Sequence, residues 1–406
     1  MSEYSQPPAG PVAAGDRIDY LDILRGFAVM AIFIVNIKGM VMPFAYYANP
    51  SLWATEFEQG IATVQKYLVD DKWRTTFTAL YGAGLLMIWD RLKARGEGRG
   101  LLLKRNLWLL FFGAFHLILI WMGDILFAYG LTGLLAMLFV RMKAWQFFVV
   151  GLPILALGSV WLSGFMALPA YVPDMAAEMK PLFWAPTEDS LNEEIAAMGG
   201  GVLDQIIYRA MGAIGYIFFY MLFGGGVVLS LGLMVVGMGL FRSGLYRGTW
   251  PLAITVPLAA AALGAAWYLD YLQITELKAS GYDFFVYSKI GWMSVLDGYL
   301  GAFGYACLIS ALVSLGIKFG AVAAVGRMAF TNYITCSLIG TTMAGGHALG
   351  MFGDVSLTTQ MIVVGVTFVG MLIWSPLWLR VFRFGPLEWL WRSLVYGQLQ
   401  PMRRAE

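Results

Sequence analysis

The stretch "LDILRGFAVMAIFIVN" at residues 21–36 is a long apolar segment that retains Asp22, Arg25 and Asn36. A charge near the middle of a bilayer costs roughly 2.5 to 3.5 kcal/mol on insertion scales, so such residues point to a function. Arg25 and Asn36 are eleven residues apart, and eleven helical steps of about 100° return close to the same face. The stretch predicts a membrane helix with a polar stripe. The stripe is either a polar path through the bilayer or an ion pair near the interface plus an amide that joins helices.

The whole chain has the composition of an integral membrane protein. It has 406 residues, of which 59% are hydrophobic and 13% charged. Apolar runs recur along it, and each has about 20 residues, which is enough to span a bilayer. We therefore predict an all-α polytopic membrane protein with about ten transmembrane helices. We place these spans at residues 21–43, 73–91, 103–121, 123–141, 145–167, 219–241, 250–270, 292–317, 325–344 and 358–381.

Charge and ligand-forming residues exclude several classes of function. The net charge of +2 gives no support for a nucleic-acid partner. Cys307 and Cys336 lie in apolar runs and lack the spacing of metal ligands or of a disulfide framework. The chain has two histidines, so we expect no metal site.

Basic residues predict the orientation of the spans, because Lys and Arg gather on the cytoplasmic side. The connection 90–105 is the most basic turn, whereas segment 168–202 is acidic. Both termini are then cytoplasmic. Residues 54–71 and 385–400 have the pattern of amphipathic helices at the outer and inner interfaces. The apolar run 205–241 is too long for one straight span, so residues 205–222 are expected to be a re-entrant, interfacial or extended helix.

This pattern divides the chain into five parts. The expected parts are a disordered tail (1–16), an N-terminal five-helix membrane half (17–167), an extracytoplasmic loop (168–204), a C-terminal five-helix membrane half (205–384), and a cytoplasmic-face amphipathic helix with its tail (385–406).

Further polar residues lie where lipid should have excluded them. His116 is expected in the outer half of its span, with Asp124 one hairpin turn away. Histidine is the side chain most easily tuned for proton transfer near neutral pH, although a hydrogen-bonded packing role is an equal alternative. Arg74, at the outer mouth, could hold an anionic group. A basic and amide-lined inner vestibule is predicted from Arg105, Arg327, Asn332 and Tyr333.

Several motifs resemble the YeiB-like family of bacterial inner-membrane proteins, whose C-terminal half is a domain of unknown function numbered 418. They include "RIDYLDILRGFAVMAIFIVNI" (17–37), "GDILFAY" (123–129) and "GPLEWLWR" (385–392). The resemblance implies a multi-pass protein of the bacterial inner membrane. The family is also distantly similar to transmembrane acyltransferases, which move an acyl group from cytosolic acyl-CoA to an acceptor on the far side.

The acyltransferase resemblance implies roles for particular residues. Related enzymes carry an arginine followed eleven residues later by a catalytic histidine, and these positions are Arg25, paired with Asp22, and Asn36 here. An amide cannot act as a general base, so His116 is the natural substitute. Asp124 would orient it, and Asn36 would polarise the acyl carbonyl.

The predicted function is therefore a transmembrane acyltransferase. It would use acyl-CoA as donor substrate, no tightly bound cofactor, and a glycan, lipid or small molecule as acceptor. A transporter using the same crevice and a non-catalytic membrane scaffold are the alternatives. The lipid bilayer is the expected partner, and a homo-oligomer is left open.

Overall fold

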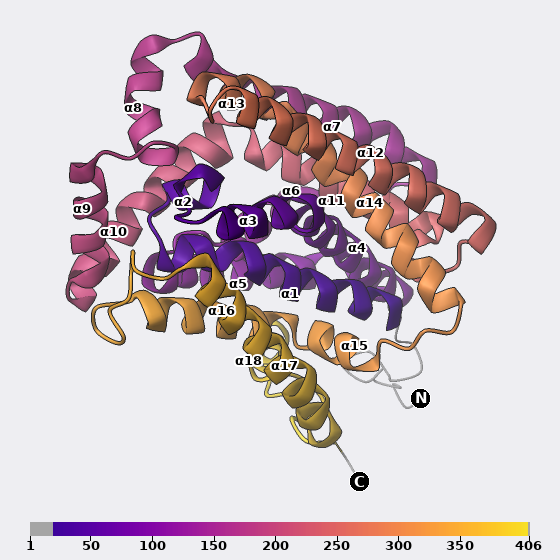
Figure 1. Cartoon of the computed structure of the whole chain (residues 1–406). Coiled ribbons are helices and arrows are strands. Elements are labelled where there is room, and N and C mark those ends of the chain that lie inside the picture. The colour runs from indigo at the N-terminus through magenta and orange to yellow at the C-terminus, as the bar shows by residue number, and fades with distance from the viewer. Residues whose placement is uncertain (1–18, 405–406) are drawn as a thin grey trace, which may run out of the picture.

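The structure is a computed structural model that describes residues 19–404, and these residues form a helical bundle (Figure 1). Within that range, the only strand-like pairing is an antiparallel bridge between Phe382 and Arg403. The predicted all-α class is confirmed. The predicted tail at residues 1–16 lies outside the described residues.

Eight of the described helices are long and apolar enough to cross a membrane, or nine if one bent pair is counted as a single span. The bent pair is α15 (Gly320–Arg327) and α16 (Ala329–Ala344), which meet at 81°. The other eight are α1 (Asp19–Val41), α5 (Gly100–Phe115) with η3 (His116–Ile120), α7 (Ala144–Ala167) with η4 (Leu168–Ala170), α10 (Val202–Gly215) with η5 (Tyr216–Phe223), α11 (Gly226–Ser243), α12 (Leu252–Ala279), α14 (Trp292–Ser314) and α17 (Leu357–Val381).

Two more helices complete the bundle. The first, α4 (Lys72–Ala94), carries charged residues near both ends, and its threonines Thr76 and Thr78 are buried. The second, α6 (Leu126–Ala136), is only 11 residues long, so the predicted span at 123–141 is wrong in length. Asp124, just before the helix, accepts a hydrogen bond from the backbone N–H of Phe127 in the first turn, and residues 137–141 continue as turns.

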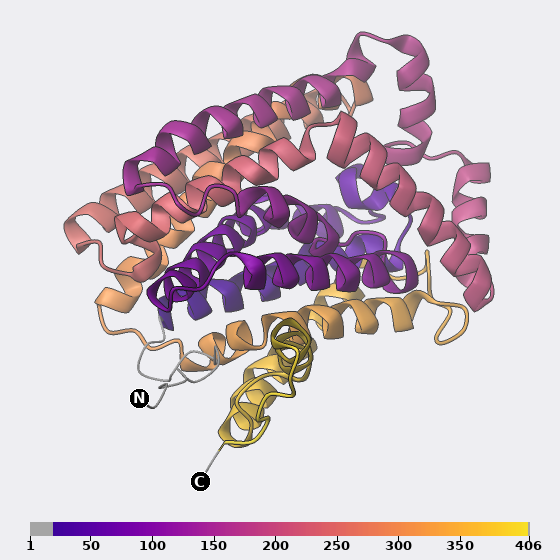
Figure 2. The ribbon, with the colours of Figure 1, turned by 180° about the vertical axis from the view of Figure 1, so that it is seen from behind.

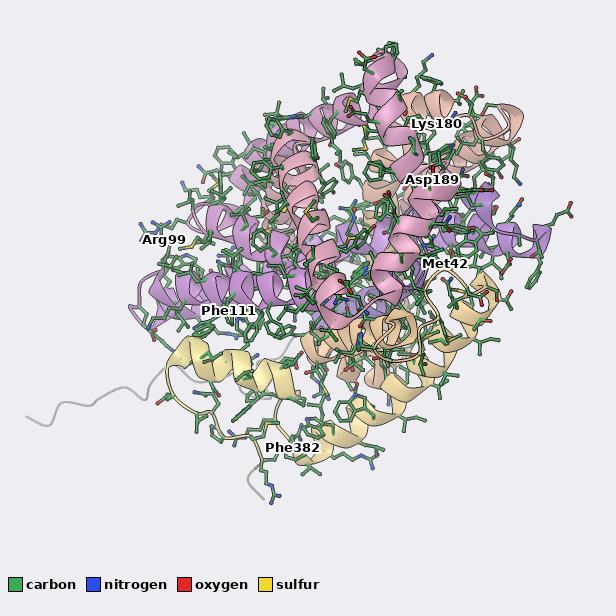
Figure 3. All side chains as sticks on the ribbon, turned by 90° about the vertical axis from the view of Figure 1, so that its left-hand side faces the viewer. Met42, Arg99, Phe111, Lys180, Asp189 and Phe382 are labelled. Atoms are coloured by element: carbon green, nitrogen blue, oxygen red, sulfur yellow. The ribbon has the colours of Figure 1, made fainter. Side chains whose placement is uncertain are left out.

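The bundle has two chemically different ends. We call one the arginine-rich end, because Arg91, Arg95, Arg105, Arg383 and Arg392 line a cavity there. The other, which we call the opposite end, is visible in Figure 3, where Lys180 and Asp189 are labelled. The short helices of that end are α2 (Ala45–Ala48), η2 (Pro50–Leu52), α3 (Glu56–Leu68), α8 (Pro173–Phe183), α9 (Glu188–Gly199) and α13 (Phe284–Ile290).

The long apolar run 205–241 is divided by glycines. Gly225 has a φ of 76°, a left-handed conformation that glycine adopts readily, so α10–η5 ends and α11 begins anew at Gly226. The predicted span at 219–241 is therefore wrong at its start. Arg209 of α10 donates to the Ile120 carbonyl, and Trp161 packs on Gly225. Both contacts lie toward the opposite end, and Val202–Phe223 is itself one of the eight helices that are long and apolar enough to span.

Helix α1 is the centre of the bundle, because 78% of its most apolar window is buried, against 28% for α5 and 22% for α17. It packs closely on α15, since a side chain at Gly26 would overlap the Val322 carbonyl and one at Gly326 would overlap the Asp22 carbonyl. In Figures 1 and 2, α17 and α18 (Pro386–Tyr396) overlap on one side of the bundle, whereas Figure 3 shows them diverging from the turn near Phe382. The predicted helix at 385–400 is confirmed and begins with Pro386 in its first turn. A short 3-10 helix, η6 (Leu245–Arg247), follows α11.

Candidate functional site

A cavity of about 250 Å³ opens at the arginine-rich end, and we call it the arginine cavity. Helices α1, α4, α5, α6, α15, α16 and α18 contribute to its wall, so it lies where both halves of the chain meet. Its acidic lining residues are Asp22 and Glu388. Its seven basic lining residues are Arg25, Arg91, Arg95, Arg105, Arg327, Arg383 and Arg392.

Several of these arginines are held in fixed positions. Arg25 Nη1 donates to Asp22 Oδ1 at 3.0 Å, and the Arg105 guanidinium lies 3.8 Å from the centre of the Trp391 ring. The Trp391 indole N–H in turn donates to the Arg105 carbonyl at 3.2 Å. The buried Nε of Arg105 has no hydrogen-bond acceptor among residues 19–404. Preorganised guanidinium groups of this kind bind phosphates and carboxylates with two N–H groups at once.

The carboxylate of Glu388 is already occupied by the protein. It accepts hydrogen bonds from the backbone N–H groups of Phe330 and Thr331, at 2.7 and 3.1 Å, and from the Thr331 hydroxyl at 2.6 Å. These groups form the first turn of α16, where a negative charge is favourable. Burial raises the pKa of Glu388, and the hydrogen bonds from Thr331 and Phe330 offset part of this rise. Glu388 therefore docks α18 onto the cavity wall.

Two tyrosines, Tyr129 and Tyr333, line the cavity. The Tyr129 hydroxyl lies 2.8 Å from the Thr78 hydroxyl. The Tyr333 ring centre is 5.3 Å from that of His116, and its hydroxyl accepts a 3.4 Å hydrogen bond from the Ile125 N–H. His116 thus lies directly behind the wall of the arginine cavity.

His116 and Asp124 form a buried pair. His116 Nδ1 is 2.8 Å from Asp124 Oδ1, and each residue is 1% exposed. The two atoms are neighbours, but their geometry is not that of a hydrogen bond. His116 begins the π-helical turn His116–Ile120, which redirects the end of α5 toward the loop that carries Asp124. An imidazole beside a fixed carboxylate is the arrangement of an oriented general base.

The structure brings some predicted residues together and separates others. Asp22, Arg25, Arg105, Arg327 and Tyr333 all line the arginine cavity.

The amides Asn332 and Asn36 are placed elsewhere. The Asn332 amide donates to the Val325 carbonyl and to Ser375 Oγ, both at 3.1 Å, so it fixes the bend between α15 and α16. Asn36 is buried on α1, and no hydrogen bond in the described part of the chain joins it to His116 or Asp124.

Arg74 lies at the opposite end, away from the arginine cavity. Its Nη2 is 2.6 Å from Asp71 Oδ1, and its Nη1 donates to the Tyr220 hydroxyl at 3.2 Å. Asp71 has a φ of 60°, an uncommon backbone conformation for a residue with a side chain.

A buried cluster of four charges was not predicted. Lys66 Nζ is 2.6 Å from Asp297 and 3.3 Å from Asp270, and Lys72 Nζ is 3.0 Å from Asp270 and 3.5 Å from Asp297. Both aspartates and Lys72 are fully buried. The sequence did contain a sign of this cluster, because both aspartates fall within predicted spans. Ionisable residues inside a span mark functional or paired sites.

The comparisons with known proteins identify the family of the chain. The model of the family described as "Protein of unknown function (DUF418)" matches residues 239–398. The uncharacterized protein YeiB of Escherichia coli (strain K12) is 31% identical over 94% of this chain and 97% of its own. The uncharacterized protein YxaH of Bacillus subtilis (strain 168) is 26% identical over 97% of this chain and 98% of its own. The chain belongs to the YeiB-like family of DUF418 proteins.

Proposed function

We propose that this protein is a membrane acyltransferase that takes an acyl group from acyl-CoA at the arginine-rich end and transfers it to an acceptor from the other side of the bacterial inner membrane. One observation carries the proposal: Tyr333 lines the arginine cavity, and its ring contacts His116 of the buried His116–Asp124 pair. A cavity with seven arginines and two carboxylates fits a ligand that bears several phosphates. The base then lies beyond the phosphate-binding region, where a reactive thioester would be.

The reaction needs one proton acceptor near the thioester. The Nε2 atom of His116 takes the proton from the acceptor hydroxyl or amine, while the acceptor oxygen or nitrogen forms a bond to the acyl carbon. The carbon–sulfur bond breaks, and the CoA thiolate leaves with a proton returned by His116. Asp124 holds the imidazole through Nδ1, and Asn36 is proposed to polarise the acyl carbonyl.

We also propose ten crossings with both termini cytoplasmic. Asp22 of α1 and Trp391 of α18 line the same cavity, which supports an even number of crossings. We do not count Val202–Phe223 as a crossing, because Arg209 within it donates to the Ile120 carbonyl and Gly225 just after it packs on Trp161. The concentration of arginines in the arginine cavity matches the rule that cytoplasmic loops are basic.

A transporter is the second candidate, and the buried Lys66–Lys72–Asp270–Asp297 cluster favours it. Buried charges at membrane depth often mark routes for substrates or protons. A transporter would move a substrate across the bilayer without releasing free CoA from acyl-CoA.

The deciding experiment uses the purified full chain in nanodiscs. Binding of acetyl-CoA is measured by calorimetry, for the native protein and for Arg105→Gln and Arg99→Gln. We expect Arg105→Gln to weaken binding by a factor of about 10 to 150, since a charge-assisted contact contributes roughly 1.5–3 kcal/mol. Arg99 lies outside the cavity lining and donates to the Met137 carbonyl, so it is the matched control. Absence of saturable binding, together with uptake of small solutes by proteoliposomes, would favour the transporter.

A further inference from the structure

A second cavity, of about 170 Å³, lies at the opposite end, and we call it the tyrosine cavity. It is formed by the end of α1, by α2 and α3, and by α12 and α13. None of its lining residues is shared with the arginine cavity. Its aromatic lining residues are Tyr46, Tyr47, Trp53, Tyr282 and Tyr287.

The tyrosine cavity contains a buried lysine without an anionic partner. Lys38 is 3% exposed and lines the cavity. Its Nζ lies 5.5 Å from the centre of the Tyr47 ring. The Lys38 ammonium group makes no hydrogen bond or ion pair with any residue from 19 to 404. An uncompensated buried charge is costly, so the cavity is suited to an anion that neutralises Lys38.

The same cavity also presents an unsatisfied acceptor. The Oδ1 atom of Asp70 is buried and receives no hydrogen bond from any described residue. The nearby cation Lys66 cannot serve it, because Lys66 Nζ already contacts Asp297, Asp270 and Ser294. A buried carboxylate oxygen without a donor costs free energy that a ligand hydroxyl or ammonium group would recover.

We infer that the tyrosine cavity is a binding site for a small organic anion that also carries a hydrogen-bond donor. The acid group pairs with Lys38, the hydroxyl or ammonium group donates to Asp70 Oδ1, and the tyrosine rings cover the rest of the molecule. Hydroxy acids, amino acids and the headgroup of a serine phospholipid all have this chemistry. The inference does not depend on acyl transfer.

The floor of the cavity is suited to such a small ligand because it is fixed. Lys66 is held by two buried aspartates, and Gln273 Nε2 donates to Ser294 Oγ at 3.0 Å. All three of these side chains, Lys66, Gln273 and Ser294, line the cavity. A floor fixed in this way does not have to be ordered when the ligand binds, which favours affinity.

The test measures thermal unfolding of the purified full chain in detergent. The probes are L-serine and D-glycerate, which carry both groups, and propionate and ethanolamine, which carry one each. Vesicles of phosphatidylserine or of phosphatidylcholine distinguish a lipid source from a soluble one. We expect a two-group probe to raise the melting temperature more than either one-group probe. Stabilisation by phosphatidylserine alone would identify the lipid headgroup as the ligand.

Two variants make the result decisive. Lys38→Met should lose the response to the probes and, without ligand, melt at or above the native temperature, because a buried unpaired charge is removed. Lys278→Met is the matched control, since Lys278 is exposed and outside the cavity. The inference is overturned if no soluble or lipid probe stabilises the native protein, if Lys38→Met responds like the native protein, or if Lys38→Met alone is markedly destabilised.

Discussion

His116 Nδ1 lies 2.8 Å from Asp124 Oδ1, and these two residues stand at the two ends of the turn that joins α5 to α6. The pair is buried on all sides, and Tyr333 separates it from the arginine cavity. Because the two residues are only eight positions apart in the chain, the short segment between them keeps the imidazole close to the carboxylate. Packing against the rest of the protein then holds this local arrangement in place.

The first prediction concerns His116. His116→Gln should lower the rate of acyl transfer from acetyl-CoA by a factor of about 10² to 10⁴, the usual contribution of a general base. Binding of acetyl-CoA should stay unchanged, because His116 does not line the arginine cavity. The rate is measured as release of free CoA by the protein in nanodiscs.

The control for this prediction is the second histidine. His347 is exposed in the turn after α16, so His347→Gln should keep the full rate. A native rate in His116→Gln would remove His116 from the mechanism. A loss of both rate and acetyl-CoA binding would indicate that the substitution disturbs the fold.

The second prediction concerns the buried charge cluster. Lys72→Met should lower the free energy of unfolding by roughly 3–5 kcal/mol, because it leaves buried Asp270 and Asp297 with one cation between them. Adding Asp270→Asn to Lys72→Met should restore part of this loss, since the numbers of buried cations and anions match again. The free energies of unfolding of the single and the double variant are measured in detergent by increasing the fraction of sodium dodecyl sulfate. Additive losses in the double variant would show that the two residues do not interact.

Much of the fold could be predicted from the sequence, because lipid imposes strong rules on composition. Apolar length alone located most of the helices, including α1, α7 and α17, to within a few residues. It could not show whether α10–η5 lies across one end, because an interfacial helix and a spanning helix can have the same hydropathy. The contact between Arg209 and the Ile120 carbonyl, which is remote in sequence, is the reason that we propose an arrangement across one end.

The candidate site was predictable only in part. The pairing of His116 with Asp124 follows from their closeness in the chain, and the gathering of Arg25, Arg105 and Arg327 follows from their expected depth. The orientation of Asn332 could not be predicted, because it depends on the 81° bend that brings Val325 and Ser375 to its amide. The burial of Lys38 could not be predicted either, since it depends on α2 folding over the end of α1.

The third prediction concerns the crossing of α4 and α11. A side chain at Gly82 would overlap the backbone of Met234, so Gly82→Ala should lower the free energy of unfolding by about 1–3 kcal/mol. Gly264 on α12 has no atom within 4 Å of the place of a side chain, and Gly264→Ala should be neutral or slightly stabilising. The same detergent unfolding assay compares them. Equal effects of the two substitutions would mean that α4 and α11 do not pack closely.

The last prediction concerns the pH dependence that Glu388 contributes. Burial raises the pKa of Glu388 above its ordinary value of 4.5, with a partial offset from the hydrogen bonds of Thr331 and Phe330. The folded protein therefore binds this proton more tightly than the unfolded chain does. The resulting stabilisation is full below the ordinary value and is lost as the pH rises through the raised pKa.

The docking of α18 should accordingly weaken as the pH rises through the raised pKa of Glu388, where the buried carboxyl ionises. Glu388→Gln keeps an acceptor for the Thr331 and Phe330 N–H groups but cannot ionise, so its melting temperature should vary less with pH than that of the native protein. Glu276→Gln, at an exposed position on α12, is the control and should keep the native profile. If Glu388→Gln and the native protein show the same pH profile, ionisation of Glu388 is not linked to folding. If Glu388→Gln flattens the profile, the contact between α18 and the first turn of α16 is the element that responds to pH, and the wall of the arginine cavity loosens as Glu388 loses its proton.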